Sequence, residues 1–228
     1  PALSKAREQA RSVVCKTYLK QWGLIFTMYA EDNDGLLVHG YIPLNPQYSK
    51  RWFDLLTDYY QNKEIYLCPS ATRPHSKVGR WGPDVAWEYN RAEGAANNKY
   101  YDDEMHVIGS YGRNFFAGNP PEHLYNPTWH WRTINVKQSN NIPLVMDAFS
   151  MMVSPYHSHQ PPELQAVPGS NFSPICITRH DTGINMVFLD AHVSEVELKQ
   201  LWDFKWNKKF DTTVKPRWPD WMKKLPEK

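Results

Sequence analysis

The sequence predicts an α+β fold in which one long N-terminal helix packs on an antiparallel sheet, with long loops inserted between the strands. Three observations support this fold class. Residues 2–31 contain no proline, and their apolar residues recur every three or four positions. Short strand-like runs follow, the clearest within residues 184–197, and proline-rich stretches separate them.

The N-terminal helix is predicted from its apolar spacing. It ends at Asp32-Asn33-Asp34-Gly35, where glycine suits a left-handed residue after the last turn. The first turns are thin and rich in alanine, so we expect this end to pack on another helix or to project from the domain. The apolar residues of the pattern are Ala6, Ala10, Val14, Tyr18, Trp22, Ile25 and Tyr29.

The rest of the chain, residues 35–228, is predicted to form a globular head. We expect a second amphipathic helix over 50–61 and strands over 65–67, 107–114 and 142–147, the last of them central. A hairpin is predicted over 184–197 and a short helix over 197–206. Inserted loops are predicted at about 71–106, 117–131 and 154–174, where proline, glycine and asparagine interrupt any period.

The hairpin places Asp190-Ala191 between two strand-like runs, which is the spacing of a two-residue turn. A type I′ turn needs positive φ at both residues, so Ala191 would cost about 1 kcal/mol where glycine would not. Either the turn is of another type or the fold tolerates this strain.

Composition and charge exclude several classes of function. Lys and Arg number 26 and Asp and Glu 24, for a net charge of +2, so no strong field attracts nucleic acid. We find no P-loop, G-x-S-x-G or G-x-G-x-x-G motif, and no histidine partner can be assigned to Cys68 or Cys176. We therefore expect a non-enzymatic protein without a nucleic-acid partner.

Several segments resemble type IV pilin-like and type II secretion pseudopilin-like proteins. Residues 1–11, Cys15, 19–21 and 28–35 resemble the segment that follows the membrane helix in proteins with a prepilin-type cleavage and methylation signal. His180, nine residues and then Asp190-Ala191-His192 resemble the prepilin-type processing-associated motif of His, nine residues and Asp-Gly. Ala191 in place of glycine departs from that motif. Residues 68–71 and 110–114 also look like that family.

The resemblance implies a pilin-like fold and a structural subunit of a bacterial secretion or surface filament system. Residues 1–34 would be the exposed half of a longer helix, preceded by a cleaved leader and about 20 apolar residues. That missing segment would anchor the subunit in the inner membrane with its head in the periplasm, or the subunit would lie in an extracellular filament at the cell surface. Its partners would be other pilin-like subunits, contacted through the N-terminal helix.

Metal binding is considered at two places, although no cofactor is expected. His157, His159, His180 and Asp190 supply the side chains of a transition-metal site, which gives a metal-dependent hydrolase as one alternative function. His180 has a second interpretation, as a buried histidine that hydrogen-bonds a loop carbonyl or Asp147.

Calcium is the other metal considered. Asp32, Asn33 and Asp34 supply oxygen ligands, but the completing glutamate of a calcium loop is absent, and a helix-ending turn is the favoured interpretation. Major pseudopilins bind calcium through a C-terminal loop. In this sequence only Asp203 and Asp211 are candidate ligands in that region, so we do not expect the same calcium site here.

The cysteines number three, Cys15, Cys68 and Cys176, with no C-x-x-C spacing. The count permits one disulfide and one buried thiol. Cys15 on the helix and Cys68 after the 65–67 segment are predicted to meet where the helix packs on the sheet. In an oxidising compartment they would form a disulfide.

Aromatic residues in the predicted loops suggest another alternative function, an extracellular carbohydrate-binding module, because aromatic faces suit sugars. The competing interpretation is that these rings pack the loops onto the sheet. The residues concerned are Trp81, Trp87, Trp129 and Trp131.

Overall fold

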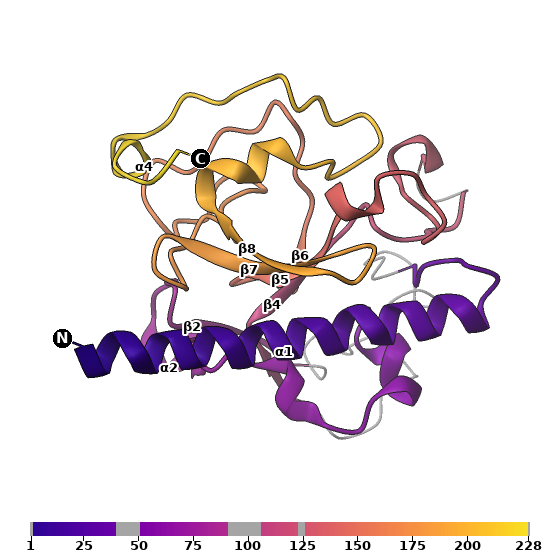
Figure 1. Cartoon of the computed structure of the whole chain (residues 1–228), viewed down its shortest axis with the longest axis horizontal. Helices are drawn as coiled ribbons and strands as arrows, with labels where there is room; N and C mark the ends of the chain where they lie inside the picture. The colour runs from indigo at the N-terminus through magenta and orange to yellow at the C-terminus, as the bar shows by residue number, and fades with distance from the viewer. Residues whose placement is uncertain (1, 40–50, 91–105, 123–125, 228) are drawn as a thin grey trace.

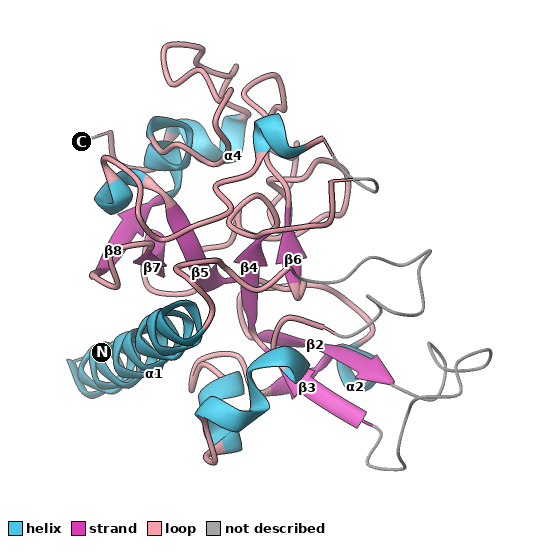
Figure 2. Cartoon of the chain, turned by 90° about the vertical axis from the view of Figure 1, so that its right-hand side faces the viewer, coloured by secondary structure: helices cyan, strands magenta, loops and turns pink. Residues whose placement is uncertain are grey.

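The protein is a mixed α+β structure built around one long helix and two sheets. The computed structural model describes residues 2–39, 51–90, 106–122 and 126–227. Helix α1 (Ala2–Asp32) lies across one face of a five-stranded sheet, and the C-terminal part of the chain covers the other face (Figures 1 and 2). The α+β class predicted from the sequence is confirmed.

The larger sheet has the strand order β6-β4-β5-β7-β8. All its pairs are antiparallel except β4 with β6, which is parallel. β5 lies in the middle of this order, as predicted, and all five of its residues are buried because both faces are covered. The strands are β4 (Tyr111–Asn114), β5 (Pro143–Asp147), β6 (Met152–Val153), β7 (Gly183–Phe188) and β8 (Val193–Glu197).

Strand β7 shows how the sheet separates two cores. Asn185 and Val187 belong to the face that contacts α1, and Asn185 Nδ2 donates to the Ser12 hydroxyl over 3.1 Å. Ile184 and Met186 lie in the second core, beneath the C-terminal layer. This alternation is the period of two expected for a strand with both faces buried.

Helix α1 ends where the sequence predicts. The Gly35 N–H donates to the Ala30 carbonyl over 2.7 Å, and Gly35 has φ 77°, the left-handed geometry that closes a helix. Residues 32–35 therefore form the helix-ending turn that the sequence favoured over a calcium loop. Asp32 accepts a hydrogen bond from the Tyr59 hydroxyl. At the other end, residues 2–11 are exposed except for the half-buried Glu8, and the helix extends past the sheet (Figure 1).

A second, three-stranded sheet corrects the prediction of an irregular insertion at 71–106. It contains β1 (Arg73–Pro74), β2 (Val85–Asn90) and β3 (His106–Gly109), with helix α2 (His75–Val78) beside it. Residues 91–105 lie outside the described residues. Gly82-Pro83 lies in a turn directly before β2, in which the Val85 N–H donates to the Gly82 carbonyl over 3.2 Å, so the Gly-Pro pair marks a turn between ordered elements and not an irregular insertion. The predicted strand 107–114 is divided between the two sheets, with Ser110 at the junction.

Several predicted elements are 3-10 helices instead. The predicted helix 50–61, whose residue 50 lies outside the description, becomes η2 (Asp54–Tyr59), and the predicted strand 65–67 becomes η3 (Lys63–Tyr66). The apolar residues of η2 and η3 pack on α1, and this packing favours short 3-10 turns over the predicted α-helix and β-strand. The predicted helix 197–206 is η6 (Leu198–Asp203). The remaining short helices are η4 (Pro127–Trp129), η5 (Ser139–Asn141) and α4 (Asp220–Lys223).

The β7–β8 hairpin has a different turn from the one predicted. Its loop is Leu189-Asp190-Ala191, and only Ala191 has positive φ, at 63°. The Ala191 N–H donates to the Phe188 carbonyl over 2.8 Å, and the Phe188 N–H donates to the His192 carbonyl over 3.0 Å. This is a three-residue turn with a left-handed third residue, so one residue instead of two adopts the strained conformation.

The hairpin turn is docked on α1. Lys20 Nζ donates to the Ala191 carbonyl over 2.8 Å. Gly23 faces the same turn so closely that a Cβ there would lie 2.8 Å from Val187 Cγ2 and 3.2 Å from Ala191 Cα. Glycine at position 23 therefore allows the helix to approach the sheet.

We expect Gly23→Ala to lower the free energy of unfolding by about 1 kcal/mol. Helix propensity alone would raise it by about 1 kcal/mol, but overpacking costs about 1–3 kcal/mol. Urea denaturation measures the difference. Gly169→Ala is the control, because the nearest atom to its Cβ would be 3.8 Å away. A more stable Gly23→Ala protein would contradict the close approach.

Candidate functional site

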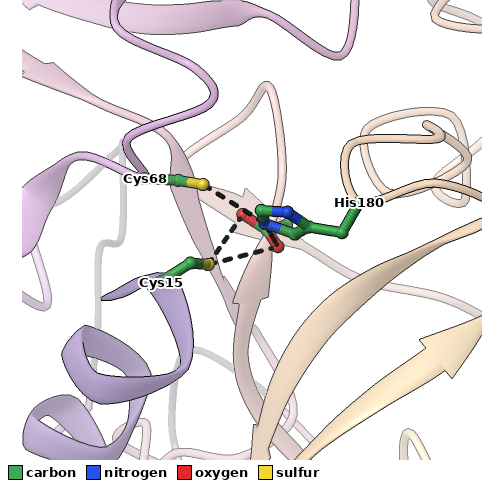
Figure 3. Close-up of side chains that lie close together, drawn as sticks. Cys15, Cys68 and His180 are labelled. Atoms are coloured by element: carbon green, nitrogen blue, oxygen red, sulfur yellow. Dashed lines mark hydrogen bonds and ion pairs between the residues drawn. The ribbon is translucent and has the colours of Figure 1, made fainter. Parts of the chain in front are cut away.

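Four side chains that can bind metal meet between α1 and the sheet. Cys15 comes from α1, Cys68 follows η3, Asp147 ends β5, and His180 lies just before β7 (Figure 3). Their ligand atoms all lie within 4.8 Å of one another, and all four residues are buried. It is the one such cluster within the described ranges, and we call it the Cys-Asp-His cluster.

Local structure fixes each member of the Cys-Asp-His cluster. Cys15 lies on the buried face of α1, four residues before Leu19. The Cys68 N–H donates to Ser110 Oγ over 2.6 Å. His180 exchanges backbone hydrogen bonds with Gly183, at 3.0 and 3.2 Å, which fixes its backbone at the entrance of β7.

The distances inside the cluster are short. Cys15 Sγ lies 3.6 and 3.5 Å from the two carboxylate oxygens of Asp147. Cys68 Sγ lies 3.3 Å from His180 Nε2, and the same nitrogen lies 3.3 Å from Asp147 Oδ2. His180 is therefore a buried histidine in an ion-pair contact with Asp147, one of the two partners that the sequence suggested for it.

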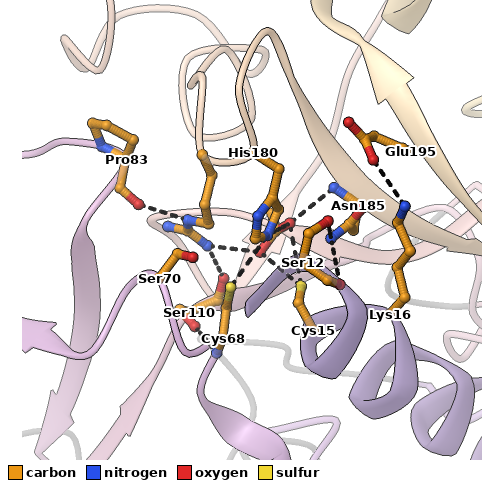
Figure 4. Close-up of polar contacts among 12 residues, drawn as sticks. Ser12, Cys15, Lys16, Cys68, Ser70, Pro83, Ser110, His180, Asn185 and Glu195 are labelled. Atoms are coloured by element: carbon orange, nitrogen blue, oxygen red, sulfur yellow. Dashed lines mark hydrogen bonds and ion pairs between the residues drawn. The ribbon is translucent and has the colours of Figure 1, made fainter. Parts of the chain in front are cut away.

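A second ring of contacts orients the cluster, and Figure 4 shows Asn185 and Ser110 within it. Glu8 Oε1 lies 3.2 Å from His180 Nδ1, and the other ring nitrogen faces Cys68 Sγ. The Asn185 N–H donates to Asp147 Oδ2 over 2.8 Å. Arg179 Nη1 lies 3.1 Å from Asp147 Oδ1 in an ion pair whose two side chains are fully buried.

These contacts change the acidity of the cluster. Burial opposes the charged forms, but the hydrogen bonds and charges of Asp147 and Cys68 raise the pKa of His180 to about 10. For Asp147, the hydrogen bond from His180 and the charge of Arg179 outweigh burial and lower its pKa. The pKa of Cys68 falls to about 7, because hydrogen bonds from Cys15 and His180 outweigh its burial. Burial raises the pKa of Cys15.

The structure therefore brings Cys68 and His180 together as a buried thiol–imidazole pair. The sequence assigned no histidine to Cys68, and the structure provides His180 as its partner. Cys68 is nevertheless fully buried, whereas the cavity of about 520 Å³ beside the cluster is lined by Glu8, Ser12 and His180 among others, and not by Cys68. This geometry suits ion binding or a disulfide.

The other predicted ligands are placed elsewhere. His157 and His159 lie in the loop at 154–174, where the ring of His157 contacts Phe210 in the core beneath the C-terminal layer. Asp190 lies in the hairpin turn, with His192 Nδ1 2.6 Å from its carboxylate. The structure does not bring these three residues to His180.

The two ends of the His-to-Asp motif both contact α1. His180 meets Glu8, and Ala191 meets Lys20 and Gly23. Those contacts are 12 to 15 residues apart on the helix, about 20 Å at the rise of an α-helix. The motif therefore attaches the first strand of the hairpin to the helix at two separate points.

The cysteines are free and buried in the structure. Cys15 and Cys68 lie together in the cluster, as the sequence predicted, and their sulfur atoms are at most 4.8 Å apart. Cys176 lies in the second core, where burial raises its pKa.

The four predicted loop tryptophans pack against protein. Trp87 is 3% exposed, and its Nε1–H donates to the Tyr111 carbonyl. Trp81 stacks on two other rings, with a centroid distance of 3.8 Å to His75. Trp129 contacts Tyr156, and Trp131 packs on the core beneath α1. These tryptophans therefore pack the loops onto the sheets, which is the competing interpretation of the aromatic residues.

The two C-terminal aspartates considered for calcium each have a local partner. Asp203 pairs with Lys215, and Asp211 accepts hydrogen bonds from the Thr213 N–H and hydroxyl.

Sequence reasoning missed two residues of the site, Glu8 and Arg179. Glu8 precedes Cys15 by seven residues, so it shares the buried face of α1 and is the one acidic residue there. Arg179 directly precedes the motif histidine.

No described helix is both long enough and apolar enough to cross a bilayer. No protein-family model, curated protein or solved structure matches the chain.

Proposed function

We propose that this chain is a pilin-like or pseudopilin-like structural subunit that assembles with other subunits through the outer face of α1. In this proposal the fold is pilin-like, with α1 as the helical spine that packs on a largely antiparallel sheet. The observation that carries the proposal is an apolar stripe along the exposed side of α1, opposite the side that packs on the sheet.

We call this surface the outer stripe. Its members fall within an arc of about 100° on a helical wheel, at 100° per residue. The large apolar side chains are unusually exposed, from 65% at Leu3 and 62% at Val13 to 48% at Met28 and 47% at Leu24. The stripe consists of Leu3, Ala6, Ala10, Val13, Val14, Thr17, Leu24 and Met28, all exposed. The half-buried Gln21 interrupts it between Thr17 and Leu24, and Glu31 and Asp32 lie at its C-terminal end.

The opposite face of the same helix is already occupied. Cys15, Leu19, Trp22 and Phe26 pack toward the sheet and are fully buried. One buried face is enough to hold a surface helix on a domain, and its other side is then normally polar. A second, largely apolar face supports a partner, because exposed apolar side chains that gather on one side of a helix mark interaction sites.

The partner that fits this face best is another helix. Ala6 and Ala10 are small, so a second helix can approach the N-terminal half closely. This part of α1 extends past the sheet and is accessible from several sides (Figure 1). In the proposal, a segment before Pro1 anchors the subunit in the inner membrane, and the head lies in the periplasm or in a surface filament.

The test is a charge substitution in the outer stripe. We expect Leu24→Glu with Met28→Glu to abolish cross-linking between subunits in membranes from cells that express the full-length precursor. Burying two carboxylates in a helix contact is unfavourable. The free energy of unfolding should change by no more than about 0.5 kcal/mol, since both side chains are exposed in the monomer.

The matched control places the same charges on another exposed apolar pair. Leu164 is 66% exposed and Val167 is 45% exposed, and both lie in the loop at 154–174. Leu164→Glu with Val167→Glu should assemble as the unmodified protein does. Normal assembly of the outer-stripe variant would refute the proposal.

A further inference from the structure

We propose that Cys15, Cys68, Asp147 and His180 bind a divalent transition metal, with Zn²⁺ preferred, in a closed four-coordinate site. This inference is independent of the proposed assembly function. It concerns the buried Cys-Asp-His cluster, whereas assembly concerns the opposite face of α1.

The donor set and its spacing fit zinc. Two thiolates, one imidazole and one carboxylate are ligands that Zn²⁺ takes in tetrahedral geometry. With bonds of about 2.3 Å to sulfur and about 2.0–2.1 Å to nitrogen or oxygen, tetrahedral edges are about 3.3–3.8 Å. Three of the six edges are 3.5 Å from Cys15 to Asp147, 3.3 Å from Cys68 to His180 and 3.3 Å from His180 to Asp147, and the other three are at most 4.8 Å, so they shorten where needed as the ion binds.

The surrounding contacts are those of a prepared metal site. A ligating histidine ordinarily donates its other ring nitrogen to a carboxylate, which fixes its orientation. Glu8 does this for His180 Nδ1, at 3.2 Å. Asp147 is fixed by Arg179 and by the Asn185 N–H, so its carboxylate is held in place before an ion arrives.

Charge balance also favours a divalent ion. The two thiols and His180 release their protons as the metal bonds form, which leaves two thiolates, one carboxylate and a neutral imidazole. The three negative charges are balanced by the divalent ion and by the buried guanidinium of Arg179, which lies 3.1 Å from Asp147. The charges of the ion, its four ligands and Arg179 therefore sum to zero.

An entry path exists beside the site. The cavity of about 520 Å³ is lined by Glu8, Ser12 and His180 among others, so an ion can reach the cluster by displacement of the Glu8 side chain. Once bound, the ion has four protein ligands and no open position, which is the coordination of a structural site. It would join α1, the segment after η3, β5 and the entrance of β7.

The experiment uses the full chain without a histidine tag, reduced, loaded with Zn²⁺ and dialysed against metal-free buffer. We expect one zinc per chain by elemental analysis and a higher Tm than after chelation. Co²⁺ in place of Zn²⁺ should give thiolate-to-metal charge-transfer absorption and the ligand-field bands of a tetrahedral ion. Cys15→Ser and Cys68→Ser should each weaken Zn²⁺ binding more than about 100-fold.

Two further variants keep the test decisive. Cys176→Ser removes a buried thiol from the other core and should leave binding unchanged. Glu8→Gln alters a half-buried residue at the rim, so the chain should still fold, and it should weaken binding about 10–100-fold. Reduced protein that retains no stoichiometric zinc would overturn the proposal. So would a Cys15–Cys68 disulfide without metal in protein isolated from its native compartment, or unchanged binding in Cys68→Ser.

Discussion

Replacing Arg179 with methionine is expected to lower the free energy of unfolding by about 3–5 kcal/mol, measured by urea denaturation in the presence of a chelator. Arg179 Nη1 pairs with Asp147, and both side chains are fully buried. The guanidinium also donates to the carbonyls of Ser110 over 2.5 Å, Pro83 over 2.8 Å and Val85 over 3.2 Å. Removing Arg179 breaks a buried ion pair and leaves His180 as the remaining ion-pair partner of Asp147, and it also leaves buried carbonyls without donors.

The control for this substitution is Arg73→Met. Arg73 pairs with Asp84 over 2.8 Å, but its side chain is 60% exposed. Exposed ion pairs contribute about 0–1 kcal/mol, so this variant should unfold almost as the unmodified protein does. Equal effects of the two substitutions would show that Arg179 does not hold the two sheets and the hairpin entrance together.

The second large effect is expected from Trp22→Ala, at about 3–5 kcal/mol. Trp22 is fully buried, and its Nε1–H donates to the Ile65 carbonyl over 2.7 Å. Its ring meets Trp52, with centroids 4.8 Å apart, and also Tyr66 at 5.7 Å. Alanine would leave a cavity between α1 and the 3-10 helices and a carbonyl without its donor.

Leu24→Ala is the matched control on the same helix, because Leu24 is 47% exposed on the outer stripe. The expected change is within about 0.5 kcal/mol, and thermal unfolding of the monomer measures both variants. A cost for Trp22→Ala no larger than that for Leu24→Ala would contradict the description of α1 as packed through its Trp22 face.

The fold was predictable from the sequence where period and end signals agree. The long helix has both an apolar period and a Gly35 stop, and β5 is a short apolar run in the chain, so both were found. The segments at 50–61 and 65–67 carry apolar residues whose spacing does not distinguish a strand, an α-helix or a 3-10 helix. The secondary structure of these two segments is decided by their packing against Trp22, and the local sequence pattern does not predict that packing.

The site was predicted in parts. The sequence placed Cys15 near Cys68, and separately placed His180 near Asp147, but nothing in it showed that the two pairs coincide. That coincidence depends on the depth at which α1 packs on the sheet, which Gly23 sets through a contact distant in sequence. Arg179 and Glu8 act through carbonyls and a ring nitrogen brought together by the fold, so their roles required the structure.

The assembly surface on α1 is tested most directly by photo-crosslinking in living cells. A photoreactive amino acid at Met28, in the outer stripe, is compared with the same residue at Leu164, which is more exposed but lies away from the helix. The account predicts that Met28 cross-links to the N-terminal helix of a second copy or of another helical subunit, and that Leu164 does not. Cross-links from Leu164 alone, or from neither position, would contradict it.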